Sequence, residues 1–252
     1  MSIAPLALQD LGKRYGRLAV LRAIDLQVAS GEIVALLGAN GCGKTTLLSI
    51  AAGLLAPSSG TRAYGPTRVV ELDRAARMRL AFVAHSTQLY ARLSALENLE
   101  LLASLRGDAP GREGLAQLLE RVGLSHAADR AAGTFSRGMQ QRLAIARALI
   151  GAPELLLLDE PFTALDHAGR AILTQVLLAE RARGAAILLS SHDLDAVAQC
   201  CDRAVLLADG RIAAQTQRER GESDDAFAPR IRALGLGRAH AHAEAHDREP
   251  AP

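Results

Sequence analysis

The sequence predicts an α/β fold with a mainly parallel sheet core, and three observations support this prediction. Continuous apolar runs at residues 33–37, 155–158 and 185–189 are typical of strands that are buried on both faces. A glycine-rich loop follows the first run, and residues 45–55 then have the pattern of a helix. Strands that alternate with helices along a chain favour a parallel sheet covered by helices.

Two further regions flank or interrupt this core. Residues 6–11 and 24–28 alternate apolar with other residues, which predicts half-buried strands and an N-terminal antiparallel β-subdomain. Between about residues 93 and 150 the strand patterns stop, and leucine and alanine recur at helical spacing. We therefore expect a helical subdomain inserted at about residues 93–150.

The C-terminal part changes character twice. Asp209-Gly210, between two short apolar segments, is a strong hairpin signal. From Thr216 the sequence turns polar, and it ends in a run rich in alanine and histidine. These features predict one domain at residues 4–215 and a disordered tail at residues 216–252. The tail histidines could bind a metal weakly, but a solvated low-complexity tail is the simpler interpretation.

Composition limits the classes of function. The chain has 252 residues, 49% of them apolar and 22% charged, which suits a single globular unit. A net charge of +2 implies no strong attraction to nucleic acid or acidic lipid, and three cysteines form neither a disulfide framework nor a metal quartet. Residues 1–10 lack a secretory signal, and no apolar run approaches the roughly 18 residues of a membrane span. We expect any membrane role to come through a partner.

The loop after the first buried strand fits the phosphate-binding pattern G-x-x-x-x-G-K-[ST]. It reads Gly38-Ala39-Asn40-Gly41-Cys42-Gly43-Lys44-Thr45-Thr46. Glycines allow the backbone N–H groups to face phosphates at a helix N-terminus. The pattern predicts that Lys44 contacts the outer phosphates, that Thr45 is a ligand of Mg²⁺ and that Thr46 adds a hydroxyl contact. A glycine-rich turn without a ligand is the alternative, and the flanking strand and helix disfavour it.

Acidic and imidazole side chains follow two other buried strands. Asp159 and Glu160 come after four leucines, and His192 follows the run at residues 185–189. We expect Asp159 to hold Mg²⁺, directly or through water, and Glu160 to polarise an attacking water. His192 could reach the outermost phosphate. The alternatives are an acidic helix cap and a structural histidine.

A third segment resembles the signature of the ATP-binding-cassette (ABC) ATPases. It stands as Phe135-Ser136-Arg137-Gly138-Met139, followed by the helix that begins Gln140-Gln141-Arg142. The resemblance implies a P-loop NTPase fold of the ABC type, ATP and Mg²⁺ as cofactors, and a homodimer. It also implies that Ser136, Arg137, Gly138 and Met139 contact an ATP held by the opposite subunit. Met139 departs from the family pattern, in which a glutamine supplies a side-chain amide.

Other positions fit the same resemblance. Tyr15 matches the aromatic residue that stacks on adenine, although a lone tyrosine is more often part of a surface or core. The run from Phe162 to Asp166 resembles the loop that contacts the partner subunit, or else a polar turn that opens a helix. His85 stands where most members carry glutamine, so it could contact Mg²⁺ or the attacking water. A loop histidine without a ligand is the alternative.

Three runs are similar to the CcmA type, the haem-exporter ATPases of cytochrome c maturation. They begin at Ala84, Leu93 and Thr134. The resemblance implies ATP-driven haem export, a CcmB-like integral membrane permease as partner, and a peripheral position on the cytoplasmic face of the inner membrane. No residue here has the pattern of a haem ligand, so we expect the membrane partner to handle haem.

Three other functions are compatible with the same motifs to different degrees. An exporter ATPase for lipid, peptide or drug would carry the same motifs, because the substrate lies in the partner. A non-transport ABC protein acting on ribosomes or DNA is disfavoured by the single cassette and the lack of a heptad run, so no nucleic-acid partner is expected. A regulatory switch without hydrolysis is disfavoured by the intact Lys44, Asp159, Glu160 and His192.

Overall fold

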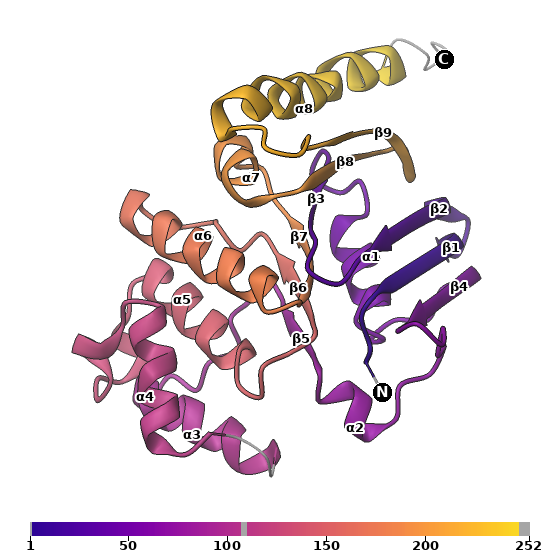
Figure 1. Ribbon diagram of the computed structural model, residues 1–252. Coiled ribbons are helices and arrows are strands. Elements are labelled where there is room, and N and C mark those ends of the chain that lie inside the picture. Colours follow the sequence, from indigo (N-terminus) through magenta and orange to yellow (C-terminus); the bar gives the residue numbers. More distant parts are fainter. Residues whose placement is uncertain (1, 107–109, 247–252) are drawn as a thin grey trace.

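The computed structural model describes residues 2–106 and 110–246, and its strands form two sheets (Figure 1). The smaller sheet is antiparallel, with strand order β2-β1-β4, and consists of β1 (Leu6–Tyr15), β2 (Leu18–Val28) and β4 (Ser59–Tyr64). The larger sheet has the order β5-β6-β7-β3-β8-β9 and is parallel except for β9. Its strands are β3 (Ile33–Leu37), β5 (Leu80–Val83), β6 (Leu155–Asp159), β7 (Ala186–Ser190), β8 (Arg203–Ala208) and β9 (Arg211–Gln217). The predicted fold class is confirmed.

The helices lie on both faces of the larger sheet. In Figure 1, α3 to α6 gather on one side of the sheet, whereas α1 and the antiparallel sheet lie on the other. The α-helices are α1 (Lys44–Ala51), α2 (Arg74–Arg77), α3 (Ala95–Arg106), α4 (Arg112–Arg121), α5 (Arg137–Ala148), α6 (His167–Ala182), α7 (Leu194–Cys200) and α8 (Asp224–His246), with 3-10 turns at Ser125–Ala127 and Ala132–Thr134. The predicted helical insertion thus contains α3, α4 and α5.

Strand β3 shows why its sequence is a continuous apolar run. Ile33, Ala35 and Leu37 pack into the hydrophobic cluster on the side of α3 to α6, and Val34 and Leu36 pack into the cluster beneath α1 and the antiparallel sheet. All five side chains are fully buried. Burial of each large aliphatic side chain stabilises the folded state by about 1.5–3 kcal/mol. Because alternate side chains of β3 enter the two clusters, this one strand stabilises the layers on both faces of the sheet.

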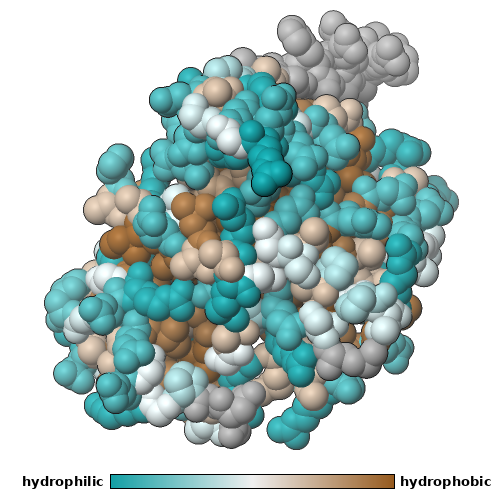
Figure 2. Space-filling model, viewed as in Figure 1, coloured by the Kyte–Doolittle hydropathy of each residue, from teal (hydrophilic) through white to brown (hydrophobic). Residues whose placement is uncertain are grey.

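The surface is mainly polar on the face in Figure 2, where apolar residues emerge in patches over the helical part of the molecule. Within the described part of the chain, no helix combines the length and the apolar character needed to cross a bilayer. Cys42, Cys200 and Cys201, all within the described residues, form no disulfide. Cys200 and Cys201 are buried, and burial raises the pKa of the Cys201 thiol well above its usual value.

Strands β4 and β5 have no counterpart in the sequence prediction. Residues 57–60 contain proline, serine and glycine, which indicate a turn, yet β4 begins at Ser59 and its first three residues are exposed. β5 is an edge strand of only four residues, three of them partly exposed. β4 has six residues but is mostly polar, and β5 is apolar but has only four residues, so neither strand produces a clear pattern.

The predicted disordered tail is corrected by the structure. β9 continues to Gln217, and α8 covers residues that the sequence analysis assigned to the tail. Phe227 and Ile231 are fully buried and join the hydrophobic cluster on the side of α3 to α6. Two apolar side chains one helical turn apart therefore anchor a segment whose average composition is polar. The last six residues of the predicted tail, 247–252, lie outside the described part.

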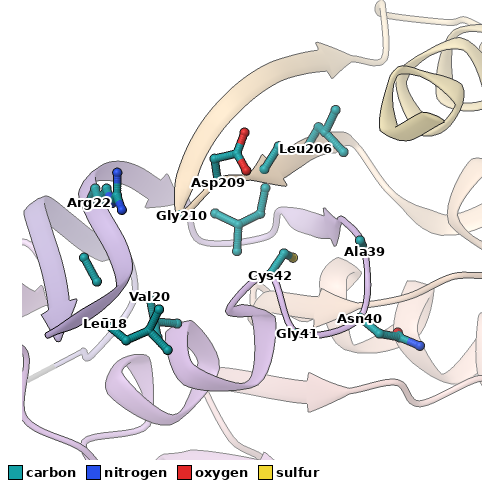
Figure 3. Close-up of a pocket in the computed structure, with 13 residues that line it drawn as sticks. Leu18, Val20, Arg22, Ala39, Asn40, Gly41, Cys42, Leu206, Asp209 and Gly210 are labelled. Atoms are coloured by element: carbon teal, nitrogen blue, oxygen red, sulfur yellow. The ribbon is translucent and has the colours of Figure 1, made fainter. Parts of the chain in front are cut away.

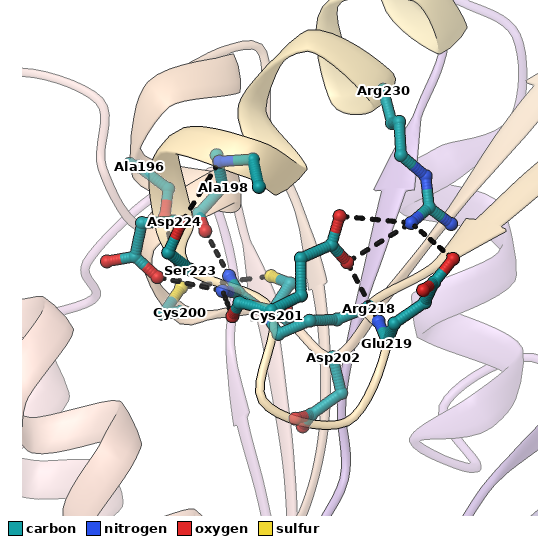
Figure 4. Close-up of polar contacts among 12 residues, drawn as sticks. Ala196, Ala198, Cys200, Cys201, Asp202, Arg218, Glu219, Ser223, Asp224 and Arg230 are labelled. Atoms are coloured by element: carbon teal, nitrogen blue, oxygen red, sulfur yellow. Dashed lines mark hydrogen bonds and ion pairs between the residues drawn. The ribbon is translucent and has the colours of Figure 1, made fainter.

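Arg218 joins α8 to the end of α7 (Figure 4). Its guanidinium donates to Asp224 Oδ1 at 2.8 Å and to the carbonyl oxygen of Cys201 at 3.2 Å, and it also donates to the carbonyl oxygen of Ala198. The same group lies 4.6 Å from the centre of the Phe227 ring, within the range of a cation–π contact. The first turn of α8 is thus held to α7 by polar and apolar contacts together.

Candidate functional site

Three parallel strands, β3, β6 and β7, end at one cavity of about 570 Å³. Ligands of α/β proteins bind outside the carboxyl ends of parallel strands, since the following loops and helix N-termini converge there. We call this space the phosphate-loop cavity. It is lined by Val20, Asn40, Gly41, Gly43, Lys44, Thr45, Thr46, His85, Asp159, Glu160, Thr163 and His192. The structure therefore brings together Lys44, Thr45, Thr46, His85, Asp159, Glu160 and His192, which the sequence analysis selected from four separate segments.

The loop between β3 and α1 places Lys44 at the cavity wall. Gly38 has φ 153°, and a Cβ atom there would lie 2.5 Å from the carbonyl oxygen of Leu207, so only glycine fits. The Lys44 ammonium donates to the carbonyl oxygens of Gly38 at 2.9 Å and Ala39 at 3.1 Å, and it lies 3.9 Å from Glu160 Oε1. The side chain is only 7% exposed. A buried cation is thus held by two neutral carbonyl oxygens and one carboxylate at the outer limit of an ion pair, where an anionic ligand would improve its environment.

Asp159 is fixed by two hydroxyl groups. Thr45 Oγ1 donates to Asp159 Oδ2 at 2.8 Å, and Ser190 Oγ donates to Asp159 Oδ1 at 2.6 Å. Ser190 also accepts from the backbone N–H of Glu160 at 2.9 Å, because the β6–β7 register sets Ser190 opposite Asp159. Ser190 is not among the residues predicted from the sequence. Its only signal is a small hydroxyl residue at the end of a buried strand, next to the strand that carries Asp159.

Glu160 and His192 form a close pair. His192 Nε2 lies 2.8 Å from Glu160 Oε1, and the backbone N–H of His192 donates to Glu160 Oε2 at 3.2 Å. Glu160 has φ 53°, a left-handed conformation that costs a non-glycine residue about 1–3 kcal/mol. Such strain persists where the surrounding structure determines it, and here it directs a carboxylate that is 12% exposed toward the cavity.

Thr45 and Asp159 fit a magnesium ion by their chemistry. A hydroxyl oxygen and a carboxylate oxygen adjoin at the cavity wall, and Mg²⁺ prefers few protein oxygens with phosphate and water completing its shell. His85 lines the same cavity but offers nitrogen, the weaker match for this ion. Among the described residues there is no cluster of three histidine, cysteine or acidic side chains that could hold a metal by itself.

Comparison with known proteins identifies the family. The family model described as ABC transporter matches residues 21–163, more than half of the chain. The chain belongs to the ABC transporter family. It is 36% identical over 217 residues to the Nod factor export ATP-binding protein I of Burkholderia orbicola, which covers 85% of this chain and 71% of the relative. It is 40% identical over 241 residues to the aliphatic sulfonates import ATP-binding protein SsuB 2 of Burkholderia lata, covering 94% and 85%.

Solved structures show the same cassette fold. An ATP-binding subunit of an ABC transporter matches with a TM-score of 0.75 and 30% identity over 90% of this chain and 99% of that one. The dimeric structure of a bacterial ABC transporter cassette matches with a TM-score of 0.77 and 28% identity, covering 85% of this chain and all of the other.

The predicted ABC signature lies at the start of α5. Ser136 caps this helix and accepts from the backbone N–H of Met139 at 3.2 Å. A Cβ atom on Gly138 would lie 2.8 Å from the carbonyl oxygen of Ala164, so the helix start packs closely on the loop after Glu160. Ser136, Gly138 and Met139 do not line the phosphate-loop cavity of their own chain. Their contact with the nucleotide of a second copy stays a prediction.

Arg137 lies nearer to the catalytic candidates than the rest of the signature. It lines a second cavity of about 350 Å³ together with His85, Thr163 and Glu160. His85 and Glu160 line both this space and the phosphate-loop cavity. They therefore lie between Arg137 of the predicted signature and the loop that joins β3 to α1.

Tyr15 is not part of the phosphate-loop cavity. It ends β1, is 50% exposed, and lies 5.3 Å below the Lys13 ammonium. Another cavity of about 500 Å³ adjoins the far side of the loop and contains Cys42 (Figure 3). Its walls come from β2, from the loop itself and from the β8–β9 turn at Asp209, so it is separate from the cluster around Asp159.

Proposed function

We propose that the chain is the ATP-hydrolysing subunit of an ABC transporter. The observation that supports this best is the arrangement of two pairs at the end of the sheet: Thr45 with Asp159, and Glu160 with His192, on one cavity with Lys44. The family match at residues 21–163 includes Lys44, Thr45, Asp159 and Glu160, and His192 lies beyond it. One similar cassette of known structure is a dimer in a post-hydrolysis state, bound to ADP and phosphate.

Each residue has a distinct part in this proposal. Lys44 and the loop amides bind the triphosphate, and Thr45 and Asp159 hold Mg²⁺. Bound there, Mg²⁺ would neutralise charge on the phosphate oxygens. Glu160 accepts a hydrogen bond from the attacking water and takes its proton, while the water oxygen displaces ADP from the outermost phosphorus. His192 orients Glu160, and it lies at the strand end from which it can reach the same phosphate.

The proposed assembly is a homodimer on a membrane permease. Ser136, Arg137, Gly138 and Met139 of one copy would complete the nucleotide site of the other, and the similar bacterial cassette of known structure, which is dimeric, supports such pairing. The permease would hold the dimer on the cytoplasmic face of the inner membrane as a peripheral subunit. We assign recognition of the cargo to the permease.

Two cargo hypotheses follow from two different observations. The hypothesis of haem export is supported by the CcmA-like runs that begin at Ala84, Leu93 and Thr134. The hypothesis of aliphatic sulfonate import is supported by relatives that are 37–40% identical to this chain and whose names specify that cargo. The discriminating experiment is ATP turnover by the purified complex with its permease, titrated with haem and with an alkanesulfonate. Stimulation by haem alone supports the first hypothesis, and stimulation by the sulfonate alone rejects it.

Glu160→Gln tests the catalytic proposal. The amide keeps the shape of the side chain but cannot take a proton, so phosphate release should fall roughly 100-fold or more. ATP should still bind, and a long-lived ATP-bound dimer should appear by light scattering. The matched control is Glu113→Gln on the exposed start of α4, which should behave as the unmodified chain. Normal turnover by Glu160→Gln would reject the assignment.

A further inference from the structure

A basic concavity of about 510 Å³ lies on the small antiparallel sheet, outside the phosphate-loop cavity. Its walls come from β1, β2, the turn between them, the start of β4 and the start of β9. The lining residues are Gly12, Lys13, Arg14, Arg17, Ala19, Leu21, Arg22, Ser58, Ser59 and Arg211. We call it the basic cavity.

Five of these residues are cations, and none of the described residues that line the cavity is acidic. Lys13 Nζ donates to the carbonyl oxygen of Ala56 at 2.8 Å, and Arg14 Nη2 donates to the carbonyl oxygen of Arg17 at 3.1 Å. Both acceptors are neutral. The Lys13 ammonium also lies over the Tyr15 ring, but no carboxylate among the described residues pairs with Lys13 or Arg14.

Arg17, Arg22 and Arg211 are freer still. All three are exposed, and within the described chain their side chains make no hydrogen bond or ion pair. Elsewhere this chain pairs many of its arginines with carboxylates, for example Arg203 with Glu32 at 2.9 Å. With a net charge of only +2 for the whole molecule, five cations around one concavity are a local concentration of charge.

Two acidic residues are close to the basic cavity in sequence, but neither lines it. Asp10 precedes Gly12 by two positions, and Asp209 precedes Arg211 by two positions. Asp209 instead lines the cavity beside Cys42, which Arg22 also borders (Figure 3). Like charges held in one concavity repel one another, and a bound anion would remove that repulsion. The geometry therefore favours an anionic occupant.

The donors favour phosphate among anions. Guanidinium groups bind phosphate oxygens through paired N–H donors, and the four exposed arginines together with Lys13 offer more charge than one phosphate needs. Ser58 Oγ accepts from the backbone N–H of Arg14, so its own proton can be donated into the cavity. The volume is within the range of small-molecule sites.

We propose that the basic cavity is a second anion site of this protein, which binds a ligand with two or more phosphate groups. The shared chemistry could come from a soluble polyphosphorylated molecule or from the headgroups of acidic phospholipid. The site goes beyond the proposed ATPase function and does not depend on it. β2 links the two sites physically, because Leu21 lines the basic cavity and a Cβ atom on Gly43 would lie 2.8 Å from Leu21 Cδ2.

The first experiment measures inorganic tripolyphosphate by calorimetry on Lys44→Ala protein, in which the nucleotide loop is disabled. We expect one ligand per chain, and we expect Arg17→Ala/Arg22→Ala/Arg211→Ala in the same background to weaken binding roughly 100-fold or more. The control, Arg74→Ala/Arg92→Ala/Arg220→Ala, removes the same charge from exposed positions outside the cavity and should bind normally. All the substituted arginines are exposed, so both triple variants should keep the melting temperature of the parent.

The second experiment separates the two sources of phosphate. The chain with an intact loop is sedimented with vesicles of phosphatidylglycerol and with vesicles of phosphatidylcholine. Binding to the anionic vesicles only, lost in the cavity variant but kept in the control, identifies lipid headgroups. Tripolyphosphate binding without vesicle binding identifies a soluble ligand. Two outcomes overturn the proposal. In the first, the cavity variant and the control bind tripolyphosphate equally and bind vesicles equally. In the second, the Lys44→Ala protein binds no tripolyphosphate and the chain with an intact loop binds no vesicles.

Discussion

Replacing Ser190 with alanine tests how the site is held together. The hydroxyl is fully buried, donates to Asp159 at 2.6 Å and accepts from the Glu160 N–H at 2.9 Å. A hydrogen bond to a charged group contributes about 1.5–3 kcal/mol, and a buried N–H left unpaired costs about 1–3 kcal/mol. We expect the free energy of unfolding to fall by about 3 kcal/mol, which for a chain of this size lowers the melting temperature by roughly 6–12 °C.

The assay is urea unfolding followed by circular dichroism, with Thr174→Val as control. Thr174 is also buried, but its hydroxyl has no hydrogen-bond partner among the described residues, so its removal should be neutral or slightly stabilising. Ser190→Ala should also reduce ATP turnover about tenfold, because Asp159 and Glu160 each lose an anchor. An unfolding midpoint equal to that of the control would refute the reasoning.

Three further changes probe other parts of the molecule. Asp159→Asn should abolish the gain in nucleotide affinity that Mg²⁺ provides, measured with fluorescent ATP with and without EDTA; an unchanged gain would mean that the ion is held elsewhere. Burial raises the pKa of Tyr64 to about 12. The neutral phenol therefore adds about 2–3 kcal/mol to the free energy of unfolding below about pH 10, and this stabilisation is lost as the pH rises toward 12. Replacing Tyr64 with phenylalanine should flatten the fall in stability over that interval, and an identical fall in both proteins would contradict the assignment. Glu180→Gln should cost about 1–2 kcal/mol, since the buried carboxylate pairs with Arg121 at 2.7 Å and with Arg183, both partly exposed; an unchanged urea midpoint would show that the pairs contribute nothing.

Local sequence determines the parts of the site that were predicted. The loop from Gly38 to Thr46 follows an apolar strand and opens a helix, so its backbone requirements are visible within a dozen residues. Asp159 and Glu160 are visible for the same reason, because a strand buried on both faces must end where they begin. These positions could be predicted since turn chemistry and periodicity are short-range properties.

The contacts that complete the site depend on strand pairing instead. Ser190 touches Asp159 only because β6 and β7 are neighbours with Ser190 opposite Asp159, and the β6–β7 register joins residues some thirty positions apart. The pair between Glu160 and His192 has the same origin. Nothing in the local sequence around Ser190 distinguishes it from Ser191.

The C-terminal segment was missed for a different reason. Composition averages over many residues, whereas Phe227 and Ile231 are single anchors that are apolar only in relation to the surface they cover. Their burial depends on the position of α7, which a composition argument does not contain.

The attachment of α8 redefines where this protein can be cut. A shortened form ending at Gln217 would lose Arg218 and uncover the apolar floor beneath Phe227 and Ile231. It would also release the far end of α7, whose near end begins directly after His192 and Asp193. A protein cut according to the core motifs alone would therefore expose an apolar, aggregation-prone surface and a less stable α7 close to His192. Purification tags are better placed after α8 than within it.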